Sequence, residues 1–134
     1  MKLKGILVDV EKGKTEKVEI ENKINEFYRL LKCRTIECPM RFLSDQKVVI
    51  ICDEEGMFNG KPSFPPAVIG IKKTNGKILE QIFGNVFICK FNGVDDFASL
   101  SEEEIDRIME CQKTCYGYVP KYGAVLFKAF ITEF

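Results

Sequence analysis

The 134 residues suit one globular domain, and a chain of this length can bury a hydrophobic core without a metal or a disulfide. Its 20 lysine and arginine residues balance 20 aspartate and glutamate residues, which argues against nucleic acid as a partner, since nucleic-acid binders normally carry a strong positive excess. Histidine is absent, which removes serine–histidine and cysteine–histidine nucleophile pairs and most catalytic zinc sites.

The first quarter of the chain predicts a β-hairpin followed by a helix. Residues 3–10 are apolar and β-prone, and Val18 and Ile20 alternate with charged residues as on a half-buried strand. Apolar side chains then recur at the spacing of one helical face: Ile24, Phe27, Tyr28 and Leu31. This stripe predicts a helix over 23–32, with Asn22 placed to cap its first turn.

Two further strands are predicted before a long loop. Residues 34–43 are β-prone, and Pro39 within them predicts an edge strand or a bulge, because proline cannot donate a ladder hydrogen bond. Residues 47–52 are almost continuously apolar, which predicts a central strand. Three prolines and two glycines within 56–66 exclude regular structure, so a loop is expected there.

The segment 67–83 leaves two interpretations open. The pair Asn75 and Gly76 is typical of a tight turn and favours a hairpin between the apolar residues on either side. The alternative is a short helix that begins at Ile78. We favour the hairpin. Residues 85–91, which follow, are predicted to form a strand.

The strongest local signal predicts a helix over residues 100–112. Ser101 and Glu104 have the spacing of a capping box, in which each side chain bonds the backbone N–H of the other. Leu100 and Ile105 have the spacing of the hydrophobic staple that accompanies such a cap.

This helix is expected to end within residues 111–115. Beyond it, residues 116–122 are rich in tyrosine and are predicted to form an aromatic loop. Residues 123–134 alternate apolar side chains on both sides, which predicts a final strand covered on both faces.

Together these elements predict an α+β fold in a single domain, residues 1–134. We expect a mainly antiparallel β-sheet of five to seven strands with two α-helices packed on one face, because regular β-α-β alternation is missing. The exposed strand at either end of such a sheet would allow a homodimer.

The order of the segments resembles a known family. The most specific parts are the apolar strand that runs into Asp53-Glu54-Glu55-Gly56 and the approach to the last helix, Asp96-Phe97-Ala98-Ser99-Leu100-Ser101. Over about residues 3–110 the chain is similar to the family catalogued as domain of unknown function 3846. It departs from the family where Leu31-Lys32-Cys33-Arg34 replaces an expected glycine pair, and the aromatic tail after residue 111 lies outside the pattern.

The resemblance implies a setting and not a chemistry. Such proteins occur in phages, plasmids and conjugative elements of bacteria, where small proteins often block host defences, and the family offers no catalytic residues to transfer. We therefore expect a non-catalytic protein of the bacterial cytoplasm that acts by binding. Its partner would be a host defence protein or a small nucleotide immune signal. The alternative is an accessory module of element replication or transfer with weak nucleic-acid contact; a thiol- or carboxylate-dependent enzyme ranks third.

The cysteines and the clustered carboxylates are candidate sites that have simpler interpretations. Cys33, Cys38, Cys111 and Cys115 could supply four thiolates to zinc, but they lack the usual tight Cys-x-x-Cys spacing, so small buried thiols are the simpler interpretation. The N-terminus lacks a signal-peptide core, and no apolar run approaches the ~20 residues of a membrane span, so free thiols are expected and no membrane contact. The carboxylates at residues 53–55 fit a solvated turn. No metal and no cofactor are expected.

Two segments, residues 57–66 and 116–122, remain as candidate binding surfaces. Both carry aromatic and basic side chains, which give large contact areas on stiff backbones and can stack on a base or pair with phosphate. The competing interpretation is that these rings cover the sheet. The expected ligand- or partner-binding residues are Arg34, Arg41, Phe58, Lys61, Phe64, Tyr116, Tyr118 and Tyr122.

Overall fold

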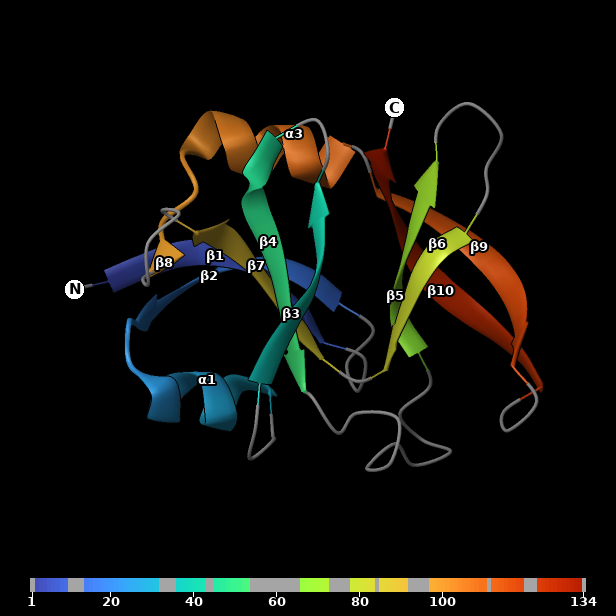
Figure 1. The fold of residues 1–134 in the computed structure, drawn as a ribbon, viewed down its shortest axis with the longest axis horizontal. Coiled ribbons are helices and arrows are strands. Elements are labelled where there is room, and N and C mark those ends of the chain that lie inside the picture. Colours follow the sequence, from blue (N-terminus) through green and yellow to red (C-terminus); the bar gives the residue numbers. More distant parts are fainter. Residues whose placement is uncertain are drawn as a thin grey trace.

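The computed structural model describes residues 2–9, 14–31, 36–42, 45–53, 66–72, 78–83, 85–91, 97–110, 112–119 and 123–133. Side-chain environments are described for residues 2–9, 14–31, 36, 48–52, 85–91 and 97–110. The described elements are arranged as two β-sheets and two helices (Figure 1). Neither described helix is long and apolar enough to cross a membrane.

The first sheet is antiparallel throughout, as expected. Its strands run in the order β2 (Lys14–Glu21), β1 (Lys2–Asp9), β7 (Val86–Phe91), β4 (Asp45–Asp53) and β3 (Ile36–Phe42), and the short β8 (Phe97–Ala98) pairs with β7. The predicted N-terminal hairpin is confirmed as β1 and β2. The continuously apolar segment is confirmed as β4, which is paired on both sides.

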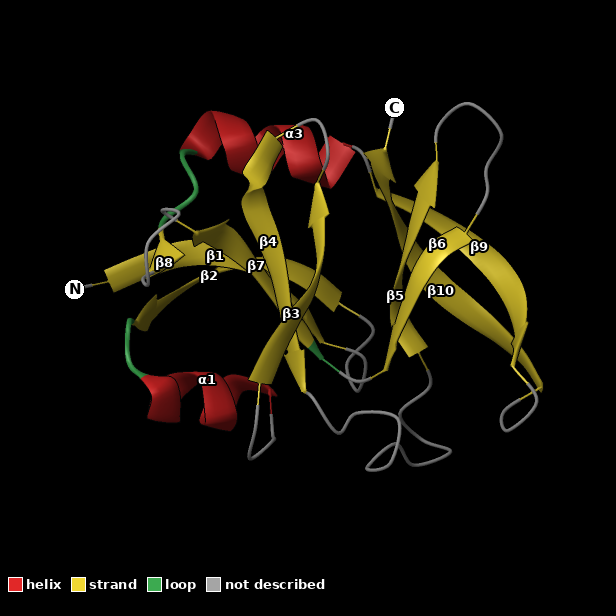
Figure 2. Cartoon of the chain, in the orientation of Figure 1, coloured by secondary structure: helices red, strands yellow, loops and turns green. Residues whose placement is uncertain are grey.

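The two helices pack on opposite faces of this sheet, so the expectation of one covered face is wrong, although the α+β class is confirmed. The helix α1 (Ile24–Leu31) lies on one face and α3 (Glu102–Glu110) on the other (Figure 2). The buried side chains are Phe27 and Leu31 of α1 and Ile105 and Ile108 of α3. Successive strand residues alternate between the faces: Ile88 belongs to the core under α3, whereas Phe87 belongs to the core under α1.

A second sheet lies beside the first and was not expected from the sequence. Its strands run in the order β6 (Ile78–Phe83), β5 (Pro66–Lys72), β10 (Gly123–Glu133) and β9 (Gln112–Val119) (Figure 1). β5 and β6 form the favoured antiparallel hairpin. β5 and β10 pair in parallel, a long-range contact that no local sequence pattern reveals.

The predicted aromatic loop over 116–122 is wrong for its first part. Residues 112–119 form β9, which pairs antiparallel with β10 from the Val119–Gly123 partners to the Gln112–Phe130 partners. Threonine, tyrosine and valine have high β propensity, and pairing with β10 extends this strand where glycine and aromatic spacing suggested a loop. The predicted final strand is confirmed as β10, while the predicted loop over 56–66 lies almost entirely outside the described residues.

Pro39 behaves as its chemistry requires. β3 is an end strand of the first sheet, and its register with β4 shifts between Glu37 and Met40, the interval that contains Pro39. Both consequences expected of a proline within a strand, an edge position and a bulge, are therefore present.

The predicted capping box of α3 is also confirmed. The Ser101 N–H donates to Glu104 Oε1 at 2.9 Å, and the Glu104 N–H donates to Ser101 Oγ at 3.1 Å. Leu100 and Ile105, the residues of the staple, are both buried in the same core.

At the start of α1, the carbonyl that accepts the first helical hydrogen bond belongs to Lys23. The side-chain amide of Asn22, the predicted cap, donates to the Phe97 carbonyl oxygen at 3.5 Å.

Gly5 on β1 provides the space that the Phe87 ring occupies. A Cβ atom at residue 5 would lie 2.5 Å from Phe87 Cζ and would also meet the backbone oxygen of Ile88. Phe87 is fully buried, and its ring centroid lies 5.9 Å from that of Phe27 on α1. The absence of a side chain at residue 5 therefore leaves room for the Phe87 ring between β1 and α1.

We predict that Gly5→Ala lowers the free energy of unfolding by about 1–3 kcal/mol, because the added methyl overpacks a site bounded by backbone. Urea denaturation followed by circular dichroism measures this change. Lys4→Ala, at the exposed neighbouring position, is the matched control and should shift stability by less than about 0.5 kcal/mol. Equal midpoints for the two variants would contradict the assigned role of Gly5.

Candidate functional site

Two polar residues are buried at one end of the first sheet. Asp9 is 7% exposed and Asn85 is 6% exposed, and they are the buried polar residues among the described side chains. Asp9 follows Val8, Asn85 precedes Val86, and Val8 pairs with Val86, so the two polar residues lie next to each other on neighbouring strands. Burial of a carboxylate beside an amide requires compensating interactions, and both residues have partners within the protein.

The register extends this polar row across the sheet. Cys52 of β4 pairs with Val86, so Asp53 also lies beside Asn85, and Ile36 of β3 pairs with Asp53. The ends of four strands, β1, β7, β4 and β3, therefore meet at one side of the sheet. A carboxylate accepts hydrogen bonds and an amide both accepts and donates them, so this end of the sheet carries hydrogen-bonding side chains on neighbouring strands.

Two segments that carry predicted binding residues begin or end beside this polar end. Arg34 precedes Ile36 by two residues, and the segment with Phe58, Lys61 and Phe64 follows Asp53. Since Ile36 and Asp53 are paired, these two segments join the sheet at adjacent points. The four residues themselves lie outside the described residues.

The other predicted binding residues are placed elsewhere. Arg41 belongs to β3 and pairs with Val49, away from the polar end. Tyr116 and Tyr118 belong to β9 in the second sheet, opposite Leu126 and Ala124, at alternate positions of one strand. Tyr122 lies outside the described residues. The three predicted binding residues that lie in described elements are thus divided between the two sheets, with Arg41 on β3 and Tyr116 and Tyr118 on β9.

The cysteines divide between the core and regions without described side chains. Cys52 is a buried free thiol in the core under α3, and Cys89 is a buried free thiol in the core under α1. Cys115 lies on β9 opposite Phe127, and Cys111 lies outside the described residues. Among the described residues no group of His, Cys, Asp or Glu is placed to hold a metal ion. Cys38 lies on β3, and Cys33 is outside the described residues.

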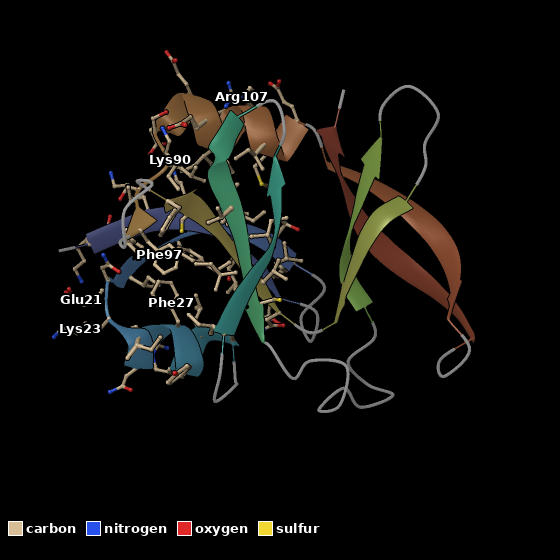
Figure 3. The ribbon with its side chains drawn as sticks, viewed as in Figure 1. Glu21, Lys23, Phe27, Lys90, Phe97 and Arg107 are labelled. Carbon is tan, nitrogen blue, oxygen red and sulfur yellow. The ribbon has the colours of Figure 1, made fainter. Side chains whose placement is uncertain are left out.

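The segment 97–101, part of the motif that carries the family resemblance, has a structural role. Phe97 packs edge-on against Phe27 at 5.3 Å between ring centroids, and against Phe91 at 5.8 Å (Figure 3). Ser99 Oγ accepts the Lys4 N–H at 2.9 Å and donates to the Lys2 carbonyl at 3.3 Å. The motif therefore connects β1 and β7 and starts α3.

Some of the charged side chains on the described surface are joined in ion pairs. The pairs are Lys2–Glu21 and Lys17–Glu102 at 3.0 Å, Arg29–Glu26 at 2.6 Å and Lys90–Glu104 at 2.8 Å. The hydrogen bond between Lys2 and Glu21 raises the pKa of the lysine and lowers the pKa of the glutamate. These charges stabilise local structure only modestly where they are exposed.

Sheet topology and helix placement define an α+β protein built on an antiparallel sheet with one helix on each face. Within that class, the chain belongs to the family described as Domain of unknown function (DUF3846), whose model matches residues 1–113. The match ends at the start of β9, so most of the β9–β10 hairpin lies beyond it. No curated protein and no solved structure matches the chain.

Glu104 yields a prediction about pH. Burial raises the pKa of Glu104, but hydrogen bonds from Lys90 and from Ser101 outweigh burial, so this pKa lies below its ordinary value. Because the unfolded-state pKa is about 4.3, ionised Glu104 stabilises the fold above that pH, and this contribution is lost as the pH falls through the folded-state pKa.

We predict that Glu104→Gln, which keeps the capping acceptor but not the charge, destabilises the fold by about 1 kcal/mol at pH 7. Denaturation at a series of pH values should show this difference shrinking toward zero as the pH falls through the lowered folded-state pKa of Glu104. Glu103→Gln, an exposed neighbour in the same helical turn, is the control. A deficit that stays constant across the pH series would argue against the charged interaction with Lys90.

Proposed function

We propose that this protein acts by binding a partner and that the contact is made at the polar end of the first sheet. The observation that carries the proposal is the pairing of Ile36 with Asp53 beside Asn85 and Asp9. This register attaches the segments with Arg34 and Lys61 to neighbouring strands, next to buried hydrogen-bonding groups.

Two further observations support binding over turnover. The chain has no histidine, so a proton-transfer catalyst near neutral pH would have to use another residue type. Among the described side chains, Lys90 forms an ion pair with Glu104, and Lys17 forms an ion pair with Glu102.

The chemistry of the predicted residues indicates an anionic, base-containing ligand. Arginine and lysine pair with phosphate, and phenylalanine stacks on a base. Together with the mobile-element setting that the family resemblance implies, this favours a nucleotide signal of host defence, held without being converted. A host defence protein that presents acidic and aromatic side chains is the second form of the same proposal.

The first experiment identifies what the protein retains. The chain is purified from bacterial cells, denatured by heat, and the released small molecules are identified by mass spectrometry, while co-purified proteins are identified from the same preparation. The purified chain is also titrated with mononucleotides and cyclic dinucleotides by calorimetry. One discrete nucleotide supports the signal trap, and a stoichiometric protein supports the second form.

We predict that Arg34→Ala and Lys61→Ala each weaken the retained contact about tenfold, since each removes one charge-assisted hydrogen bond. Arg29→Ala is the matched control, because Arg29 is an exposed arginine on α1 whose charge pairs with Glu26. Conversion of a metabolite at a rate abolished by one substitution would refute binding without turnover. Steeply salt-dependent association with DNA would instead favour the accessory role in replication or transfer.

A further inference from the structure

The edge strand β2 has one set of backbone groups directed away from its neighbour. The Lys4 N–H donates to Ser99 Oγ and the Lys4 carbonyl accepts from the Leu100 N–H, so the even-numbered residues of β1 direct their backbone groups away from β2. Hydrogen bonds between β1 and β2 are therefore made by the odd-numbered residues of β1 and the even-numbered residues of β2. Gly5 and Val18 form one such pair. It follows that Lys17 and Glu19 direct their N–H and C=O groups to the outer edge.

The side chains along this edge alternate in a way that suits pairing with itself. Lys17 and Glu19 are exposed and lie on the α3 face, where Lys17 also contacts Glu102 at 3.0 Å. Val18 lies on the α1 face, partly buried against the core that contains Ile20. Among the described elements, β2 pairs with β1 alone. Charged residues on an edge strand usually prevent a second strand from pairing with it. Opposite charges two residues apart prevent pairing only in the registers that place like charges opposite each other.

We infer that β2 pairs antiparallel with β2 of a second copy, about a two-fold axis at Val18. In this register Lys17 lies opposite the partner's Glu19, and Glu19 lies opposite the partner's Lys17, so both cross-strand pairs are attractive. Moving the axis by one residue places Lys17 opposite the partner's Lys17, or Glu19 opposite the partner's Glu19. Charge therefore selects the axis at Val18.

The same axis brings Val18 against the partner's Val18 on the α1 face, beside the apolar core of each copy. The first sheet would then run without interruption through both copies. The pairing between the two β2 strands is short. It ends at Glu21, because the Glu21 carbonyl already accepts the Lys23 N–H of the same chain at 2.9 Å. The dimer is accordingly in exchange with monomer. This assembly is independent of the proposed ligand.

Charge reversal tests the register. Sedimentation velocity over a concentration series should show the unmodified chain dimerising, whereas Lys17→Glu and Glu19→Lys alone each weaken dimerisation at least about tenfold, because two like-charged pairs face each other. An equimolar mixture of the two variants should dimerise like the unmodified chain, because every reversed charge then faces its opposite.

Two controls separate this interface from a folding defect. Glu102→Gln removes the intrachain contact of Lys17 and should leave dimerisation unchanged, and thermal denaturation checks that each variant is folded. A chain that stays monomeric throughout the series overturns the proposal. So do single variants that dimerise normally, or a mixture that fails to recover.

Discussion

Burial of both faces of the central strands is the constraint on which the first sheet depends. β7 lies between β1 and β4, and its residues alternate between the core under α3 and the core under α1. The arrangement requires a fully buried Phe87, and that ring fits because residue 5 on β1 has no side chain. The helices are held by this strand pattern, since their propensities alone would not keep segments of eight and nine residues folded in water.

Local chemistry predicted much of this arrangement. Proline in β3, the capping box of α3 and the apolar run of β4 each act through residues close in sequence, and each had the expected consequence. Which face a helix covers depends on how distant strands pair, so the sequence could not place α1 and α3 on opposite faces. The second sheet was missed for the same reason, because β5 and β10 come together across most of the C-terminal half.

The candidate site was predictable only in its residue types. Basic and aromatic residues near Arg34 and Lys61 were identified from composition, but the role of Asp9 and Asn85 was not, because an aspartate after a strand usually marks a solvated turn. The signal that could have found them is positional. Each is a polar residue directly adjoining a continuously apolar strand, and the alternation of those strands assigns both to the face under α1.

The parallel pairing of β5 with β10 has a consequence for the order in which the two sheets can form. Every strand of the first sheet and both helices lie before residue 111, so their pairings do not depend on β10. The β5–β6 hairpin, by contrast, has to wait for β10, and during that interval its edge is open to other chains. The sheet that forms last is also the one completed by residues beyond the family match, so relatives could differ in this layer without altering the first.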